Sequence, residues 1–285
     1  MENNKGLTPR VYLWENRVLY SGPAFAPRYR CYGSSALVAS LGQPMNIHRQ
    51  THADDPVTTR ACLIHPGLPV YIDTGGSPLA VVFLDPMQQD FEAMKTSATL
   101  EHHGIFHGFH HSGHIVRVLE NIAEYGGSPD QALESLGSIG LTEMTRPATH
   151  GSDPRLTRAI DLIRQSRTAS ITTENIAATI SLSVPRVIQL FRQHIGVSAG
   201  RYRQWHRLHA AVLGVANGHS FTQAALGAGF SDLAHFSNTF HGMLGIMPSS
   251  PLRHHGVTRY YVDHQLATDG FTAMIPIKSE TAGVC

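Results

Sequence analysis

The sequence predicts an α+β protein with two domains, a β-rich domain followed by an all-α domain. Its 285 residues exceed the usual size of one domain. Short apolar runs separated by glycine and proline fill the first hundred residues, whereas apolar residues recur with a helical period from about His114 onward. Charge divides in a similar way, since residues 1–150 hold 10 Lys or Arg and 14 Asp or Glu, whereas residues 151–255 hold 10 Arg and 4 acidic residues.

Five apolar runs of strand length occur in the first domain. They span residues 11–14, 17–20, 35–41, 61–64 and 79–84. The turn signals between them are Gly22-Pro23, Gly42-Gln43-Pro44, His65-Pro66-Gly67 and Gly75-Gly76-Ser77-Pro78. Because many short strands joined by such turns are typical of sandwiches and barrels, we expect a β-barrel or a sandwich here.

A helical hairpin is predicted after these strands. The buried face of its first helix consists of Ile115, Val118, Leu119 and Ile122. This helix ends at Gly126-Gly127, and Ser128-Pro129 begins the second helix with an N-cap and a proline in the first turn. The hairpin could pack on the β domain or pair with its copy in a second subunit, and the general prevalence of two-fold dimers favours a homodimer.

Four segments follow from these features. The predicted boundaries are 1–140 for the β-rich domain, 141–152 for a linker, 153–255 for the all-α domain and 256–285 for a C-terminal tail. The linker contains Pro147 and Gly151 and has no sustained apolar period.

Two short helices and a three-residue turn lie in the all-α domain. The helices are predicted over 175–180 and 184–194, with Ser181-Leu182-Ser183 between them. Ser183 is a good N-cap, and Pro185 fits the first turn of the second helix. A basic second helix after such a turn indicates a helix-turn-helix, in which the second helix enters the major groove of DNA.

The same pattern recurs further along the chain. A short helix is followed by the turn Gly229-Phe230-Ser231 and by a helix over 232–244, so that Phe191 and Phe240 occupy matching positions. A connecting helix over residues 198–217 would be roughly 30 Å long. Since one turn of DNA repeats after about 34 Å, this length allows both units to face one duplex.

Six motifs occur in register across both units. They are Asp153-Pro154-Arg155-Leu156, Leu190-Phe191-Arg192, Gly196-Val197-Ser198, Arg207-Leu208 with Ala211, Gly229-Phe230-Ser231-Asp232 with His235-Phe236-Ser237 and Phe240, and Gly245-Ile246 with Pro248-Ser249. This segment resembles the DNA-binding domain of the AraC/XylS family of bacterial transcription activators. The N-terminal segment is similar to the cupin-like ligand-sensing and dimerisation domain of that family, in part through His65-Pro66-Gly67 and Leu84-Asp85-Pro86.

The resemblance implies a sequence-specific transcription regulator, expected to be an activator. Its implied partners are double-stranded promoter DNA, RNA polymerase, a small-molecule effector and a second copy of the chain. The expected fold is therefore an N-terminal β-barrel or cupin-like domain with a helical hairpin, and a C-terminal all-α domain with two helix-turn-helix motifs joined by a long helix.

The resemblance also places the DNA-binding residues. The base-contacting positions of the family fall on Pro185, Ile188 and Gln189 in the first unit and on Ala234, His235 and Asn238 in the second. Gln and Asn can pair with adenine through two hydrogen bonds, whereas Ile188 and Ala234 can make only apolar contacts, for example with a thymine methyl. Contacts to phosphate, which position the protein without specifying sequence, are expected from Arg186, Arg192, Arg201 and Arg203.

The sequence departs from the family pattern at Ala224, Gly227, Pro185 and Pro251, and one assigned residue has a second interpretation. His235 could instead be a packed or capping side chain. Ala224 stands where the family usually has a larger aliphatic residue, so that the second unit is expected to be looser than the family norm.

A histidine-rich segment, His102–His114, supports a metal-responsive regulator as an alternative. If the segment were helical, its weak candidate ligands, His103, His107, His110 and His114, would share one face and could bind Zn²⁺. Several glycines oppose a regular helix here, and a solvated or partly buried polar segment is favoured. The prediction is therefore no metal and no cofactor.

Enzyme and membrane functions find little support. The sequence has no Gly-x-Ser-x-Gly elbow, no His-Glu-x-x-His and no phosphate-binding Gly-x-x-x-x-Gly-Lys. We predict that the protein is not an enzyme, with a cupin-type enzyme as a second alternative. Sparse cysteines without Cys-x-x-Cys spacing, no secretory signal and no apolar run of about 18 residues predict a cytoplasmic protein with no membrane partner.

Overall fold

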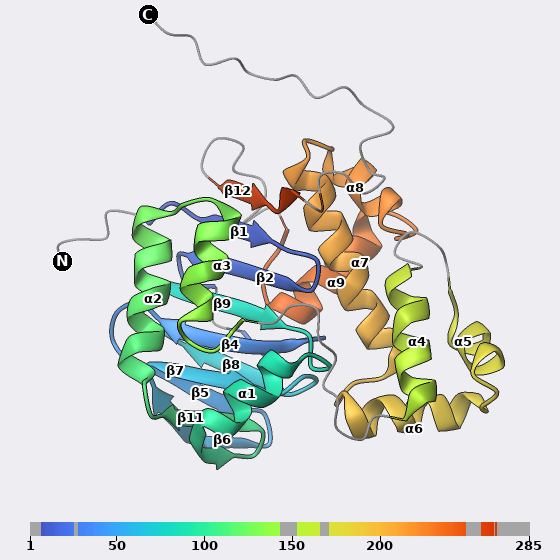
Figure 1. Ribbon diagram of the computed structural model, residues 1–285, viewed down its shortest axis with the longest axis horizontal. Coiled ribbons are helices and arrows are strands. Elements are labelled where there is room, and N and C mark those ends of the chain that lie inside the picture. Colours follow the sequence, from blue (N-terminus) through green and yellow to red (C-terminus); the bar gives the residue numbers. More distant parts are fainter. Residues whose placement is uncertain are drawn as a thin grey trace, which may run out of the picture.

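Two β-sheets form most of the N-terminal half of the chain in the computed structural model (Figure 1). The structure describes residues 7–25, 28–142, 153–165, 171–248, 258–264 and 266. The strands are β1 (Arg10–Leu13), β2 (Arg17–Gly22), β3 (Arg30–Cys31), β4 (Ser35–Ser40), β5 (Met45–Arg49), β6 (His52–Thr59), β7 (Ala61–Ile64), β8 (Pro69–Asp73), β9 (Leu79–Leu84), β10 (Ala98–His102), β11 (Ile105–Phe109) and β12 (Arg259–Val262). In the larger sheet their order is β10-β11-β7-β4-β9-β2-β1-β12, and in the smaller sheet it is β3-β8-β5-β6.

Helices cover the larger sheet and form the C-terminal half of the chain. Those of the first half are α1 (Gln89–Ser97), α2 (Ser112–Tyr125) and α3 (Pro129–Gly137). Those of the second half are α4 (Pro154–Gln165), α5 (Thr173–Thr179), α6 (Val184–His194), α7 (Ala199–Ala216), α8 (Phe221–Gly227) and α9 (Leu233–Leu244).

Both faces of the larger sheet are buried along β1, β2, β4, β7 and β9, which explains the continuous apolar runs in these strands. Alternate residues of a strand point to opposite faces. Val11 and Leu13 join one core cluster with the smaller sheet and with α7 and α9, whereas Tyr12 and Trp14 join another with α2 and α3. The sheet is therefore sandwiched between the helical hairpin and the rest of the molecule.

The predicted strands and helical hairpin are confirmed. The five apolar runs form β1, β2, β4, β7 and β9, and the hairpin forms α2 and α3. Ser128 caps α3 in a reciprocal capping box with Gln131. Leu119 and Leu136 are buried in the core cluster beneath the sheet, so the hairpin packs on the β domain (Figure 1).

The helical alternative for the histidine-rich segment is wrong. Residues 98–109 form the antiparallel pair β10 and β11, with the reversal at His103 and Gly104, both at positive φ. His103, His107, His110 and His114 therefore share no helical face. In the part of the chain that the structure describes, no group of three or more His, Cys, Asp or Glu side chains could hold a metal ion.

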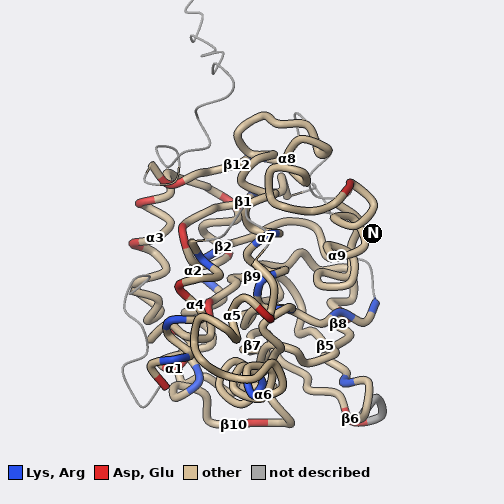
Figure 2. Tube along the Cα trace, turned by 90° about the vertical axis from the view of Figure 1, so that its right-hand side faces the viewer, with Lys and Arg blue, Asp and Glu red and all other residues tan. Residues whose placement is uncertain are grey.

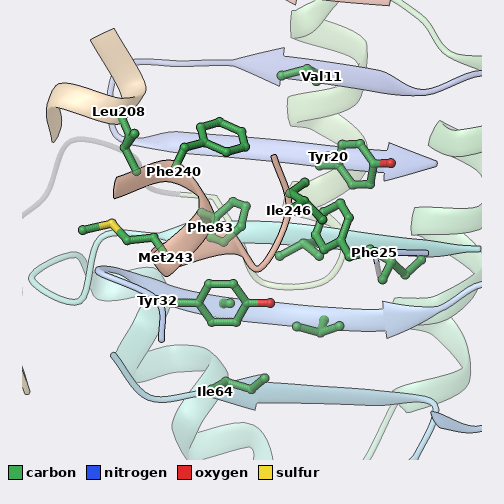
Figure 3. Packing of buried hydrophobic residues seen from close by; sticks show 14 of the residues in the cluster. Val11, Tyr20, Phe25, Tyr32, Ile64, Phe83, Leu208, Phe240, Met243 and Ile246 are labelled. Carbon is green, nitrogen blue, oxygen red and sulfur yellow. The ribbon is translucent and has the colours of Figure 1, made fainter. Parts of the chain in front are cut away.

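The second half of the chain packs directly on the first. Phe240, Met243 and Ile246, at the end of α9 and just beyond it, share one core cluster with Tyr20 and Phe83 of the larger sheet (Figure 3). This apolar contact places the second predicted helix-turn-helix unit against the β domain. None of the helices among the described residues is both long and apolar enough to span a bilayer.

Candidate nucleic-acid interface

The first helix-turn-helix unit is built by α5 and α6. Thr172 caps α5 in a reciprocal capping box with Asn175, and the turn at Ser181 has a positive φ of 54°. Ile176, Val187 and Phe191 are buried in a core cluster that also includes α4 and the start of α7. Because this face of α6 is buried, the opposite face of the helix points to solvent.

The solvent face of α6 carries the predicted contact residues of the first unit. Pro185, Arg186, Gln189 and Arg192 are exposed, and Ile188 is half-buried. An open depression on this face is lined by Pro185, Ile188, Gln189, Arg192 and Gln193. The Nη1 atom of Arg186 donates a hydrogen bond of 2.7 Å to Oε1 of Gln189. The structure therefore brings the five predicted residues of α6 onto the part of the helix that is not buried in the core. Lys or Arg positions on α6 are blue in Figure 2.

Gln193 belongs to this surface but is absent from the predicted set. It is exposed and lies four residues after Gln189, on a neighbouring part of the same helix face. Helical spacing from Gln189 would have identified it.

The second unit is built by α8 and α9. Ser220 and Gln223 form a capping box on α8, and Asp232 Oδ1 accepts a hydrogen bond of 2.7 Å from the backbone N–H of His235 at the start of α9. Helix α9 ends at Gly245, whose φ of 74° is the left-handed C-cap conformation that glycine favours.

The exposed face of α9 presents the predicted residues unequally. Ala234 and Asn238 are exposed, four residues apart on one face of the helix. His235 is half-buried, its Nδ1 lies 3.1 Å from Ser231 Oγ, and its ring packs edge-on against Phe230 at 5.2 Å. The structure thus leaves Asn238 as the most accessible hydrogen-bonding side chain of the predicted set in this unit.

Two of the predicted phosphate contacts, Arg201 and Arg203, bond to backbone carbonyls of other segments. Arg201 donates through Nη2 to the carbonyl oxygens of Cys31 and Gly242, and Arg203 donates through Nη1 to the carbonyl oxygen of Ile171. Both side chains are half-buried on α7. In this arrangement they hold elements together, and phosphate contact by either guanidinium stays a prediction.

A buried polar cluster joins the two halves of the chain beside α7. Asp85, in the loop after β9, accepts hydrogen bonds of 2.7 Å from both Arg164 Nη2 and the Tyr202 hydroxyl. The Nε2 atom of His206 lies 3.9 Å from the same carboxylate. Sequence analysis did not identify this cluster, because its members come from three elements far apart in the chain.

The charge state of Asp85 follows from these partners. Burial alone would raise the pKa of Asp85, but the charges of Arg164 and His206, with the hydrogen bonds from Arg164 and the Met87 backbone N–H, lower the pKa below the ordinary 3.8. The same carboxylate raises the pKa of Arg164, although burial opposes this. The cluster is therefore an ion pair at neutral pH.

Comparison with known proteins identifies the helical half. A family model described as a helix-turn-helix domain matches residues 176–254, which cover both units. The XylDLEGF operon transcriptional activator of Pseudomonas putida is 29% identical over 147 residues, which is 50% of this chain and 44% of that protein. Residues 176–254 are an AraC/XylS-type helix-turn-helix domain. The second helix of a helix-turn-helix unit is the one that enters the major groove, and α6 and α9 are the second helices of the two units.

A second relative has the same level of identity over a shorter stretch. The HTH-type transcriptional regulator ArgR of Pseudomonas aeruginosa is 29% identical over 98 residues, which is 34% of this chain and 30% of that protein. The chain thus spans less than half the length of either relative.

The two-domain arrangement resembles that of ToxT from Vibrio cholerae. The apo structure aligns with a TM-score of 0.56 and 9% identity over 85% of this chain and 98% of ToxT. ToxT bound to an unsaturated fatty acid aligns with a TM-score of 0.51 and 12% identity over 88% of this chain and 96% of ToxT. At this identity the likeness is one of fold.

Proposed function

We propose that the chain is a sequence-specific transcription regulator, an activator that binds promoter DNA through α6 and α9. The observation that carries this proposal is the pair of exposed helix faces, each opposite a buried apolar face, within one AraC/XylS-type domain. The proposed domains are 1–140 and 153–255, joined by the linker 141–152. A catalytic role is not needed for this function, and a cytoplasmic location, a homodimer and contact with RNA polymerase are part of the proposal.

The base contacts are proposed for Gln189 in the first unit and Asn238 in the second. Both are exposed, and their amides can form two hydrogen bonds with adenine. Exposed Arg186 and Arg192 supply the phosphate contacts of α6. Ile188 and Ala234 supply apolar contacts on the same faces.

Electrophoretic mobility shifts with the purified full chain test DNA binding. Promoter fragments next to the gene are compared with shuffled duplexes of equal length at physiological salt. We expect preferential binding to a promoter fragment, because side chains that reach base edges discriminate between sequences. Equal affinity for promoter and shuffled duplex, in the presence and absence of cell extract that supplies effectors, would contradict the proposal.

An effector site is proposed in the apolar cavity between the two domains. This cavity of about 60 Å³ is lined by Val11, Val18, Tyr20, Phe25 and Phe83 of the β domain and by Trp205, Leu208, His209, Val212, Phe240, Leu244 and Ile246 of the helical domain. The lining favours an apolar compound, and the fatty acid bound by ToxT shows that a protein of this fold accepts an apolar chain.

The small size of the cavity suggests how an effector would act. An engineered protein cavity of about 150 Å³ is known to bind benzene, so this cavity is smaller than one that holds a single aromatic ring. A larger effector must therefore displace side chains of α7 or α9, and its binding would change how α9 packs on the β domain. This link between ligand and recognition helix is the proposed route of regulation.

Ligand-induced shifts in melting temperature test the effector site. The native protein is screened against fatty acids and small aromatic compounds, and Val212→Phe, which fills the cavity, is compared with Leu226→Phe on the exposed surface of α8. We expect Val212→Phe to abolish the shift given by a ligand and Leu226→Phe to preserve it. A shift retained in Val212→Phe would place the effector elsewhere.

A further inference from the structure

The chain returns to the β domain after the DNA-binding helices. Strand β12 lies at the edge of the larger sheet, parallel to β1, with Arg10 opposite Arg259 and Leu13 opposite Val262 (Figure 1). The backbone N–H of Arg259 donates to the carbonyl of Pro9 at 2.9 Å, and that of Asp263 donates to the carbonyl of Leu13 at 3.0 Å. The helical domain is thus followed by a segment that is hydrogen-bonded to the first strand of the protein.

The two faces of β12 contact different parts of the molecule. Tyr261 stacks on Tyr12 with ring centroids 4.4 Å apart, on the side of the sheet covered by α2 and α3. Tyr260 and Val262 pack on the opposite side, in the core cluster that contains Leu208 of α7. Leu266 is also buried in this cluster. Strand β12 therefore contacts the β domain and the helical domain together.

The helical domain is held on the β domain by a second contact far from β12. Strand β3, in the smaller sheet, packs against α9, and Arg201 of α7 donates to the carbonyl of Cys31. At Gly33, a Cβ atom would lie 3.0 Å from Trp205 and 3.3 Å from Met243, so the two domains approach closely here. Loss of domain docking would separate β3 from α7 and α9.

We propose that β12 is a C-terminal clasp that holds the second helix-turn-helix unit on the β domain and so sets how readily that unit is released. Its regulatory meaning rests on the proposed function, in which movement of α9 links an effector to DNA binding. The docking itself is independent of DNA. Each backbone hydrogen bond lost from β12 should raise about fivefold the fraction of molecules in which the second unit is released from the β domain.

The reaction rate of the Cys31 thiol with a thiol-specific reagent measures this opening. Cys31 is partly exposed and lies beside the α9–β3 contact, whereas Cys62 is buried in the sheet core and reports global unfolding. The full chain carries Cys285→Ser, so that the tail contributes no thiol. Cys31 lies in β3 of the smaller sheet, whereas β12 belongs to the larger sheet. Cys31 is therefore neither in β12 nor in a strand that pairs with it.

The decisive comparison is Arg259→Pro against Arg259→Ala. The side chain of Arg259 is exposed, so alanine leaves the strand intact, whereas proline removes the N–H that bonds Pro9. We expect the part of the Cys31 reaction rate that depends on opening to be about fivefold faster in Arg259→Pro and unchanged in Arg259→Ala. A chain ending at residue 257, which lacks β12, should react faster still.

Equal Cys31 rates in the native chain, in Arg259→Pro and in the truncated chain, with Cys62 still protected, would overturn the clasp. If the truncated chain fails to fold, Cys62 becomes reactive and the comparison rests on Arg259→Pro. Because no DNA is present, this result is distinguishable from failure of the proposed DNA binding.

Discussion

Tyr202 and Asp85, 117 residues apart in the sequence, form a buried hydrogen bond of 2.7 Å that joins α7 to the loop after β9. Arg164 of α4 pairs with the same carboxylate oxygen. The side chain of Asp85 is only 3% exposed, so its charge depends on these partners rather than on water. The cluster fastens α4 and α7, which pack against the first helix-turn-helix unit, to the β domain, while the apolar contact of α9 fastens the second unit.

Asp85→Ala should destabilise the protein by about 3 to 5 kcal/mol, because it leaves the buried guanidinium of Arg164 without its counter-charge. The free energy of unfolding in urea measures this loss. Glu120→Ala is the matched control, since Glu120 pairs with Arg60 at 2.7 Å but both side chains are well exposed. The control should lose less than about 1 kcal/mol. Similar losses in both variants would show that burial does not strengthen the Asp85 pair.

The Asp85 cluster should also weaken in acid. Because its pKa is lowered in the folded state, the stabilisation by Asp85 is present above its ordinary value of 3.8 and is lost as pH falls through the folded pKa. The difference in the free energy of unfolding between the native chain and Asp85→Asn should therefore be largest above about pH 5 and shrink below pH 3.8. A difference that is constant from neutral pH to pH 3 would contradict an ionised Asp85.

Local signals predicted most of the helices and five strands of the larger sheet, but not the smaller sheet. The N-cap Ser128 begins its helix as its sequence context indicates, because a cap depends on residues only three positions away. Ser183 also begins α6, although its side chain makes no capping hydrogen bond. Strand β10 escaped prediction because it lies at a sheet edge with mostly exposed residues and has no apolar face. Strand β12 also escaped it, since its partner β1 lies at the other end of the chain.

Asn238→Ala and Arg192→Ala should weaken DNA binding in different ways. Asn238→Ala should cost about 1 to 3 kcal/mol on the preferred site and relax the choice of one base. Arg192→Ala should weaken binding to all sequences alike and reduce the slope of log affinity against log salt by about 1. Competition binding with single-base variants of the operator, at several salt concentrations, measures both effects. Identical behaviour of the two variants would disprove the assignment of base and phosphate contacts.

The faces of α6 and α9 were predictable because one helical period decides which residues are buried and which are exposed. The interior bonds of Arg201 and Arg203 were not predictable in the same way. Their acceptors, the carbonyls of Cys31 and Ile171, belong to other elements. Spacing along α7 contains no information about those neighbours.

Ala224→Leu should destabilise the second unit, although the family usually has a larger residue here. Ala224 is fully buried, and a Cβ atom on Gly214 would lie 3.1 Å from its Cβ, so α7 and α8 approach closely at this point. Overpacking should cost about 1 to 3 kcal/mol. Thermal unfolding measures the loss, with the exposed Leu226→Ala as control, which should change stability by less than about 0.5 kcal/mol. A gain in stability from Ala224→Leu would show that the unit is loosely packed.

Of the two tryptophans of the chain, Trp205 has its ring where the domains meet, whereas the ring of Trp14 is buried beneath the helical hairpin. The carbonyl of Trp14 lies 2.8 Å from His209 Nε2 of α7, and the ring of Trp205 packs against Phe83 of β9 with centroids 4.9 Å apart. Intrinsic tryptophan fluorescence of the unlabelled protein therefore reports domain separation. Its emission wavelength and its quenching by a soluble quencher can be followed during titration with an effector.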